Sequence, residues 1–231
     1  DPGGPHHEKE IDMRIEKGTI TKIAARIPKG MGEEIHVKGM HASPGWVDLR
    51  AHFRDPGEEW KQGVRNGLDA AAAGGFTRVA VLPSTDPVMD KSSGVANLLS
   101  RANGHVVQVL PVGALTQGLK GEQLAELHDL RTAGAVAYCD DQHTVRNSRL
   151  MLLALQYANG LPGIKPPIMV FPNDPDLSLN GMMHEGTMST RLGLKGIPPM
   201  AETIQLARDL ELLEYAGGHL HVATISTTGS V

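Results

Sequence analysis

Short apolar runs alternate with helical patterns along most of the chain. From residue 46 onward, apolar residues either fill a short run or recur at the three- and four-residue spacing of a helix that covers a core. The runs predict strands at 46–53, 77–83, 106–114, 135–141, 168–171 and 219–226. The helical spacing predicts helices at 58–74, 91–102, 122–133, 146–159 and 199–216. Strands that alternate with helices in this way form parallel βαβ units.

The first part of the chain has a different pattern. Between residues 11 and 35, short apolar alternations are broken by Lys17-Gly18 and by Pro28-Lys29-Gly30, which predicts β-hairpins. We therefore expect a small β lobe at 1–43, with residues 1–7 disordered, and a βα domain at 44–231.

Two α/β architectures are compatible with this alternation, an open doubly wound sheet and a (β/α)₈ TIM-type barrel. Polar residues cluster at the C-terminal ends of several of the predicted strands, as in barrel active sites; they include Ser84, Asp140, Asn173 and Ser226. No Gly-x-Gly-x-x-Gly follows the first strand of the βα domain, which argues against a dinucleotide site. We predict a barrel, and because only six strands are found, an incomplete one that is truncated at its C-terminal side.

Composition narrows the class of partner. The net charge is −4, without a block of like charge, so no nucleic-acid or anionic-membrane surface is indicated. No apolar run approaches the roughly 18 to 20 residues that span a bilayer. The single cysteine, Cys139, excludes an internal disulfide and fits a reducing compartment, so we expect a cytoplasmic protein with small-molecule or protein partners.

The stretch 44–57 carries the strongest chemical signal. Asp48, Arg50 and His52 occupy every second position of a predicted strand and therefore project to one side. His-x-His at a strand end is a common metal-ligand spacing, but Arg50 stands in the first position, and a guanidinium cannot ligate a cation. The other interpretation is a buried cluster of charges that pair internally.

This stretch resembles the Asp-x-His-x-His-x-Arg-x-Pro-Gly motif of the dihydroorotases, in the amidohydrolase superfamily. The resemblance runs from about residue 12 to the C-terminus and is close at 180–186 and 193–202. It implies a barrel preceded by a β lobe, a zinc site, and hydrolysis of the cyclic amide of dihydroorotate in pyrimidine biosynthesis. It also places the general base of the family on a last strand that these 231 residues do not contain.

The resemblance fails selectively at the metal. Of the four histidine ligand positions of the family, His52 alone is retained, and the others hold Arg50, Phe171 and Thr224. Asp141 lies in a segment similar to the family's Asp-Asp-Gly, where in some members an aspartate bridges the metals; capping of the next helix is the alternative. We name His52 and Asp141 as the remaining metal candidates and expect zinc to be absent or weakly bound.

Two further residues match substrate-binding positions. Arg54 aligns with the arginine that forks onto the substrate carboxylate, and a surface salt bridge with Asp55 is the alternative. Asp86 stands where the family usually has an asparagine, and its charge would repel an anionic substrate. Asp86 before Pro87 is also a common turn former. We name no catalytic residue.

These departures favour a non-catalytic homologue over an active cyclic amidohydrolase. Such a pseudoenzyme would keep the barrel as a scaffold for another protein, by resemblance aspartate transcarbamoylase, and we expect a homo-oligomer. A buried guanidinium needs a carboxylate, so Arg50 should fill the place of the metal beside Asp48, Asp140 or Asp141.

Overall fold

A computed structural model describes residues 3–30 and 32–231. The chain divides into two compact units, Asp1–Gly45 and Trp46–Val231. The expectation of disorder at 1–7 falls in part on residues 1 and 2, which lie outside the described residues; the part that follows, from Gly3 to Glu8, consists of turns and a bend.

The first unit contains one hairpin, formed by β1 (Asp12–Glu16) and β2 (Thr19–Ala24). Its turn uses positive φ at both Lys17 and Gly18, the conformation that two-residue hairpin turns require. The second hairpin predicted around residue 29 is wrong: the described residues between Ala24 and Trp46 contain no strand. Side chains of β1 bind this segment instead, since Asp12 accepts a hydrogen bond from the Ile27 amide and Arg14 donates one to the Pro28 carbonyl.

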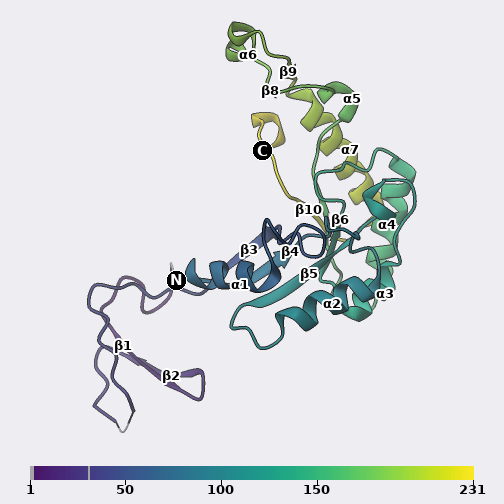
Figure 1. The fold of residues 1–231 in the computed structure, drawn as a ribbon. Coiled ribbons are helices and arrows are strands. Elements are labelled where there is room, and N and C mark those ends of the chain that lie inside the picture. The colour runs from purple at the N-terminus through teal and green to yellow at the C-terminus, as the bar shows by residue number, and fades with distance from the viewer. Residues whose placement is uncertain (1–2, 31) are drawn as a thin grey trace. The chain divides into compact units, whose positions relative to one another are not determined.

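The second unit is built on a six-stranded parallel sheet, as the sequence predicts. In sheet order the strands are β10 (Leu220–Val222), β7 (Ile168–Val170), β6 (Ala137–Cys139), β5 (Gln108–Ala114), β4 (Phe76–Val81) and β3 (Trp46–Ala51). The sheet curls, so the unit is a half-barrel of the TIM type (Figure 1). Because the order begins with β10 and ends with β3, these two are its edge strands.

Helices pack on one face of this sheet. They are α1 (Val64–Ala73), α2 (Ser92–Ala102), α3 (Leu127–Ala133), α4 (Ser148–Gly160) and α7 (Met200–Ala216). The main core lies between them and the strands, with Leu68, Val95, Leu130 and Leu155 almost fully buried. Helix α1 begins six residues later than predicted, where the buried Asp55 carboxylate accepts a hydrogen bond from the Val64 amide. That bond satisfies one of the free amides of the first helical turn.

Helix α3 is also shorter than the pattern at 122–133 predicts. The chain before it forms the 3₁₀ turn η1 (Gln117–Leu119) and folds back on itself. The Gln117 amide donates to the Gln123 carbonyl and the Ala125 amide to the Leu115 carbonyl. The first of these bonds occupies the Gln123 carbonyl, which in a longer helix would accept a hydrogen bond from the Leu127 amide.

Several short elements have no periodicity from which to predict them. They are α5 (Pro175–Ser178), β8 (Met183–His184), α6 (Thr187–Leu192), β9 (Gly196–Ile197) and η2 (Thr228–Ser230). β8 and β9 pair in a separate parallel sheet. Among the residues described, no helix is long and apolar enough to cross a membrane.

The other face of the sheet is concave and apolar. A cavity of about 390 Å³ lies there, lined by residues of the strands such as Leu49, Val112 and Met169. The prediction that 46–53 is a strand covered on both faces is wrong, because Trp46, Val47 and Leu49 are 61%, 45% and 50% exposed. The reason is that β3 is an edge strand, with a neighbouring strand on one side only, and that its Leu49 faces this open cavity.

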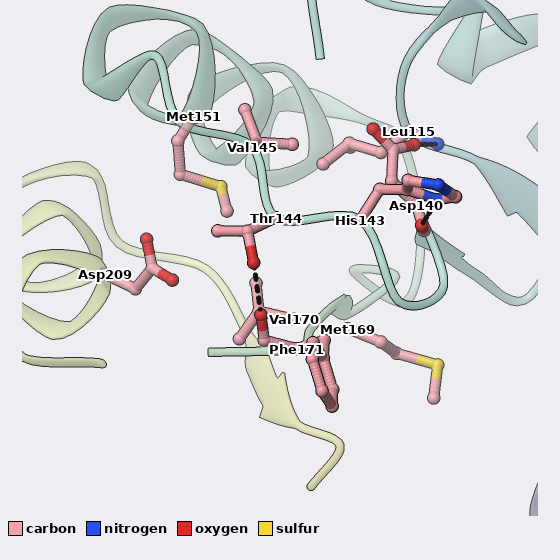
Figure 2. A pocket seen from close by; sticks show the side chains of 10 residues that line it. All are labelled: Leu115, Asp140, His143, Thr144, Val145, Met151, Met169, Val170, Phe171 and Asp209. Atoms are coloured by element: carbon pink, nitrogen blue, oxygen red, sulfur yellow. Dashed lines mark hydrogen bonds between the residues drawn. The ribbon is translucent and has the colours of Figure 1, made fainter. Parts of the chain in front are cut away.

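A smaller cavity of about 10 Å³ lies between the ends of β6 and β7 and the helices α4 and α7 (Figure 2). Its lining includes Asp140, Met151, Phe171 and Asp209. This volume holds about one water molecule, so the cavity is too small for an organic substrate.

Candidate functional site

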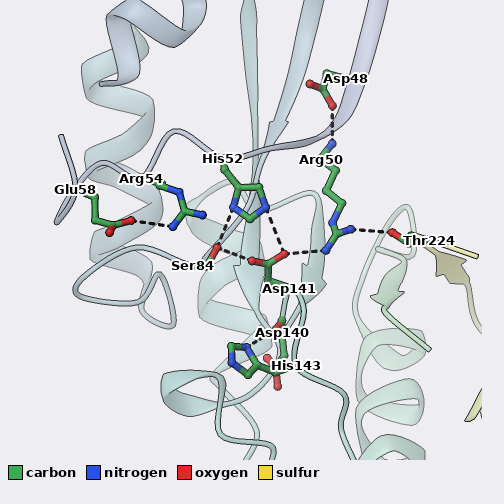
Figure 3. A network of polar contacts seen from close by, with 10 residues as sticks. All are labelled: Asp48, Arg50, His52, Arg54, Glu58, Ser84, Asp140, Asp141, His143 and Thr224. Carbon is green, nitrogen blue, oxygen red and sulfur yellow. Dashed lines mark hydrogen bonds and ion pairs between the residues drawn. The ribbon is translucent and has the colours of Figure 1, made fainter. Parts of the chain in front are cut away.

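Polar side chains meet at the carboxyl ends of the parallel strands (Figure 3). Arg50 belongs to β3 and His52 follows it, while Ser84 comes after β4, Asp141 after β6 and Thr224 after β10. Parallel strands bring their carboxyl ends to the same edge of a curled sheet. Residues up to 174 positions apart in the sequence are therefore in contact.

Arg50 is the central group of this site. Its Nη2 lies 3.0 Å from Oδ1 of Asp141, and its Nη1 donates a 2.8 Å hydrogen bond to Oγ1 of Thr224. The guanidinium carbon is 5.6 Å from the centroid of the Phe171 ring. Asp48 accepts a hydrogen bond from the backbone amide of Arg50, at 2.8 Å. Asp48, Asp140 and Asp141 were the carboxylates expected to hold the guanidinium, and Asp141 is the one that forms the ion pair.

Asp141 contacts two further side chains. Ser84 donates a 2.8 Å hydrogen bond to its Oδ2, and Nε2 of His52 lies 3.5 Å from its Oδ1. The Ser84 hydroxyl is also 3.3 Å from Nδ1 of His52. The sequence places Ser84 only among the polar residues at strand ends; its position directly after the predicted strand at 77–83 was the available signal.

Asp140 points away from this cluster. Its carboxylate accepts hydrogen bonds from the Leu115 and Thr116 amides and from the Thr116 hydroxyl. Burial raises the pKa of Asp140 above its ordinary value. Asp141 lies in the turn after β6 with a φ of 54°, and its carboxylate faces the cluster that the Asp140 carboxylate does not reach.

Comparison with known proteins gives the same family as the motif at 44–57. Residues 40–230 match the family model described as dihydro-orotase-like. The chain belongs to the dihydroorotase-like family. The curated dihydroorotase of Geobacter metallireducens is 43% identical over 228 residues, which are 97% of this chain and 53% of that protein. The dihydroorotase of Desulfotalea psychrophila is 46% identical over 193 residues, which cover 84% of this chain and 45% of that protein.

A solved structure shares the fold. The L-hydantoinase (dihydropyrimidinase) from Arthrobacter aurescens superposes with a TM-score of 0.67 at 17% sequence identity, covering 94% of this chain and 49% of that one. This likeness supports the incomplete TIM-type barrel. The chain spans about half the length of the curated relatives it matches.

The side chains of this dihydroorotase-like chain do not fit a zinc ion. Zinc takes three or four nitrogen, sulfur or oxygen ligands from the protein. His52 and Asp141 are the two donors at the site, and in the ranges 3–30 and 32–231 no group of three or more His, Cys, Asp or Glu side chains could hold a metal. A fixed cation, Arg50, already contacts the carboxylate. The phenyl ring of Phe171 offers no lone pair.

The two expected substrate-binding residues lie on neighbouring loops. Arg54 forms its salt bridge with Glu58, at 2.8 Å, and not with Asp55 as the alternative interpretation had it. Asp55 is buried, where it pairs with Arg101. Asp86 is exposed, and its backbone amide donates a 3.0 Å hydrogen bond to the Pro56 carbonyl. The substrate-binding role of Arg54 and Asp86 stays a prediction.

Proposed function

We propose that this chain is a dihydroorotase-like protein of pyrimidine biosynthesis that does not hydrolyse dihydroorotate and acts as a scaffold for a partner protein. The observation that carries the proposal is the ion pair between Arg50 and Asp141. A guanidinium stands where the family resemblance places a metal-binding imidazole.

The chemistry of ring opening explains why this substitution matters. Hydrolysis of a cyclic amide needs an activated water and a group that delivers a proton to the leaving nitrogen. The guanidinium of Arg50 stays protonated, so it neither removes a proton from water nor binds water as a Lewis acid does. The oxygens of the Asp141 carboxylate already contact Arg50, Ser84 and His52.

A combined measurement tests the proposal. The purified protein should hold less than about one equivalent of zinc per chain, because a site with two donors binds the ion weakly. In the ultraviolet assay of dihydroorotate ring opening, with zinc supplied, it should give no rate above the buffer. The dihydroorotase of Geobacter metallireducens serves as the positive control. Two tightly held equivalents, or clear turnover, would refute the non-catalytic function.

The partner is proposed by the family resemblance alone. We expect a homo-oligomer that binds aspartate transcarbamoylase in the cytoplasm, a location supported by the single buried cysteine. Light scattering on a size-exclusion column, with each protein alone and then mixed, would detect the complex. If the two proteins elute separately at micromolar concentrations, aspartate transcarbamoylase is not a partner of this chain.

An active metal-dependent cyclic amidohydrolase is the second candidate. Curated relatives that are 41% to 46% identical are named dihydroorotase. His52 and Asp141 also remain 3.5 Å apart, close enough to share one ion. The same zinc and turnover measurements distinguish the two candidates.

A further inference from the structure

We propose that Arg50 is a built-in cation that takes the place of a metal ion and joins the two edge strands across the mouth of the half-barrel. This inference goes beyond the proposed function, because it concerns what holds the site together. It holds whether or not the chain binds a partner.

The contacts of Arg50 connect residues from three strands of the sheet. Arg50 lies on β3, and Thr224 lies two residues beyond the last residue of β10; these strands are the opposite edges of the six-stranded sheet. One branch of the guanidinium donates to Thr224 at 2.8 Å. The other reaches Asp141, after the inner strand β6, at 3.0 Å. A single planar group therefore links three strand ends (Figure 3).

Because the ion pair between Arg50 and Asp141 is partly buried, we expect it to contribute more to stability than a surface ion pair does. The Arg50 and Asp141 side chains are 23% and 8% exposed. The Phe171 ring, directly after β7, lies within the range of a cation–π contact with the guanidinium. Removal of one member of a partly buried pair leaves the other charge without compensation. A divalent ion brought to Asp141 would also be repelled by the fixed positive charge of Arg50.

Thermal unfolding tests the structural role. Arg50→Met should lower the midpoint by about 5 °C or more, because it leaves Asp141 without its counter-ion. The matched control is Arg54→Met, since the Arg54 pair with Glu58 is more exposed; its midpoint should change by less than about 2 °C. When Asp141 is first replaced by asparagine, Arg50→Met should lower the unfolding midpoint by no more than half as much as it does in the wild type. Equal losses in both backgrounds, or at both arginines, would overturn the inference.

Zinc binding tests whether Arg50 alone blocks the metal. Arg50→His adds an imidazole beside His52 and Asp141, which makes three donors. After gel filtration, this variant should retain about one equivalent of zinc more than the wild type. Arg50→His/Asp141→Asn is the matched control for zinc bound at other histidines, and it should lose that gain. If Arg50→His retains no more zinc than the wild type, Arg50 does not occupy a metal's place.

Discussion

Gly57 packs so closely against Asp86 that a Cβ added at position 57 would lie 2.6 Å from the Asp86 Cβ and 2.8 Å from its carbonyl oxygen. Gly57 also has a φ of 111°, in a region that side-chain-bearing residues rarely adopt. Together with the bond from the Asp86 amide to the Pro56 carbonyl, this contact fixes the loop of Arg54 against the loop of Asp86.

We predict that Gly57→Ala destabilises the protein by about 3 kcal/mol, from backbone strain and steric overlap combined. Gly104→Ala is the matched control, because Gly104 also has positive φ but no atom within 4 Å of its added Cβ. That variant should cost only about 1 kcal/mol. Urea unfolding gives both values. Similar losses for the two variants would show that the loops are not held together at Gly57.

Glu202 makes stability depend on pH. The Glu202 carboxylate, in α7, accepts hydrogen bonds from the amides and hydroxyls of Ser226 and Thr227. Burial alone would raise the pKa of Glu202, but the hydrogen bonds from Ser226, Ser230 and Thr227 outweigh it and lower the pKa to about 2. A carboxyl with a depressed pKa stabilises the fold above its ordinary value of 4.5, and this contribution is lost as the pH falls towards 2.

The expected result is a pH-dependent difference between wild type and Glu202→Gln. Wild type should be the more stable protein above about pH 5, and the difference should shrink towards zero near pH 2. The measurement is the free energy of unfolding by urea across this range. A difference that stays constant with pH would show that the Glu202 charge is not involved.

The hydrophobic pattern predicted the six strands and the order of the main helices, because spacing along the chain is a local property. It did not predict that β3 would be exposed. Apolar residues such as Val47 and Leu49 are compatible with burial, but what covers them depends on strands far away in the sequence.

The partners of the charged residues were harder to predict for the same reason. From the sequence, Asp48, Asp140 or Asp141 could each have paired with Arg50. The curled sheet brings Asp141, 91 residues away in the sequence, next to the guanidinium. For Arg54, the nearest carboxylate in sequence was the wrong one, because Asp55 turns into the core and Glu58 remains at the surface. Proximity in sequence does not show which way a side chain points.

Cys139 should be inert in the folded protein. It is 3% exposed, and burial raises the pKa of its thiol to about 12, whereas the reactive species is the thiolate. We expect no reaction with Ellman's reagent at pH 8 in the time that fully modifies the chain in guanidinium chloride. Rapid modification of the native protein would contradict the burial of Cys139.

Restoring the family's three missing histidines should restore zinc binding. Arg50→His/Phe171→His/Thr224→His should bind at least about one equivalent of zinc, because the Arg50 guanidinium contacts Thr224 and Asp141 and lies 5.6 Å from the centroid of the Phe171 ring. The variant with alanine at the same three positions is the matched control. It removes the guanidinium without adding imidazoles and should bind no more zinc than the wild type.

In the triple variant, the rate of dihydroorotate ring opening should recover less completely than zinc binding does. A metal lowers the pKa of its bound water to about 7, but an anionic substrate must still approach the Asp86 carboxylate, and Arg54 is already paired with Glu58. We therefore expect the triple variant to hydrolyse dihydroorotate poorly in the ultraviolet assay, and the addition of Asp86→Asn to lower the KM. Efficient turnover by the triple variant alone would show that Asp86 does not oppose the substrate, and that the lost imidazoles account for the whole defect.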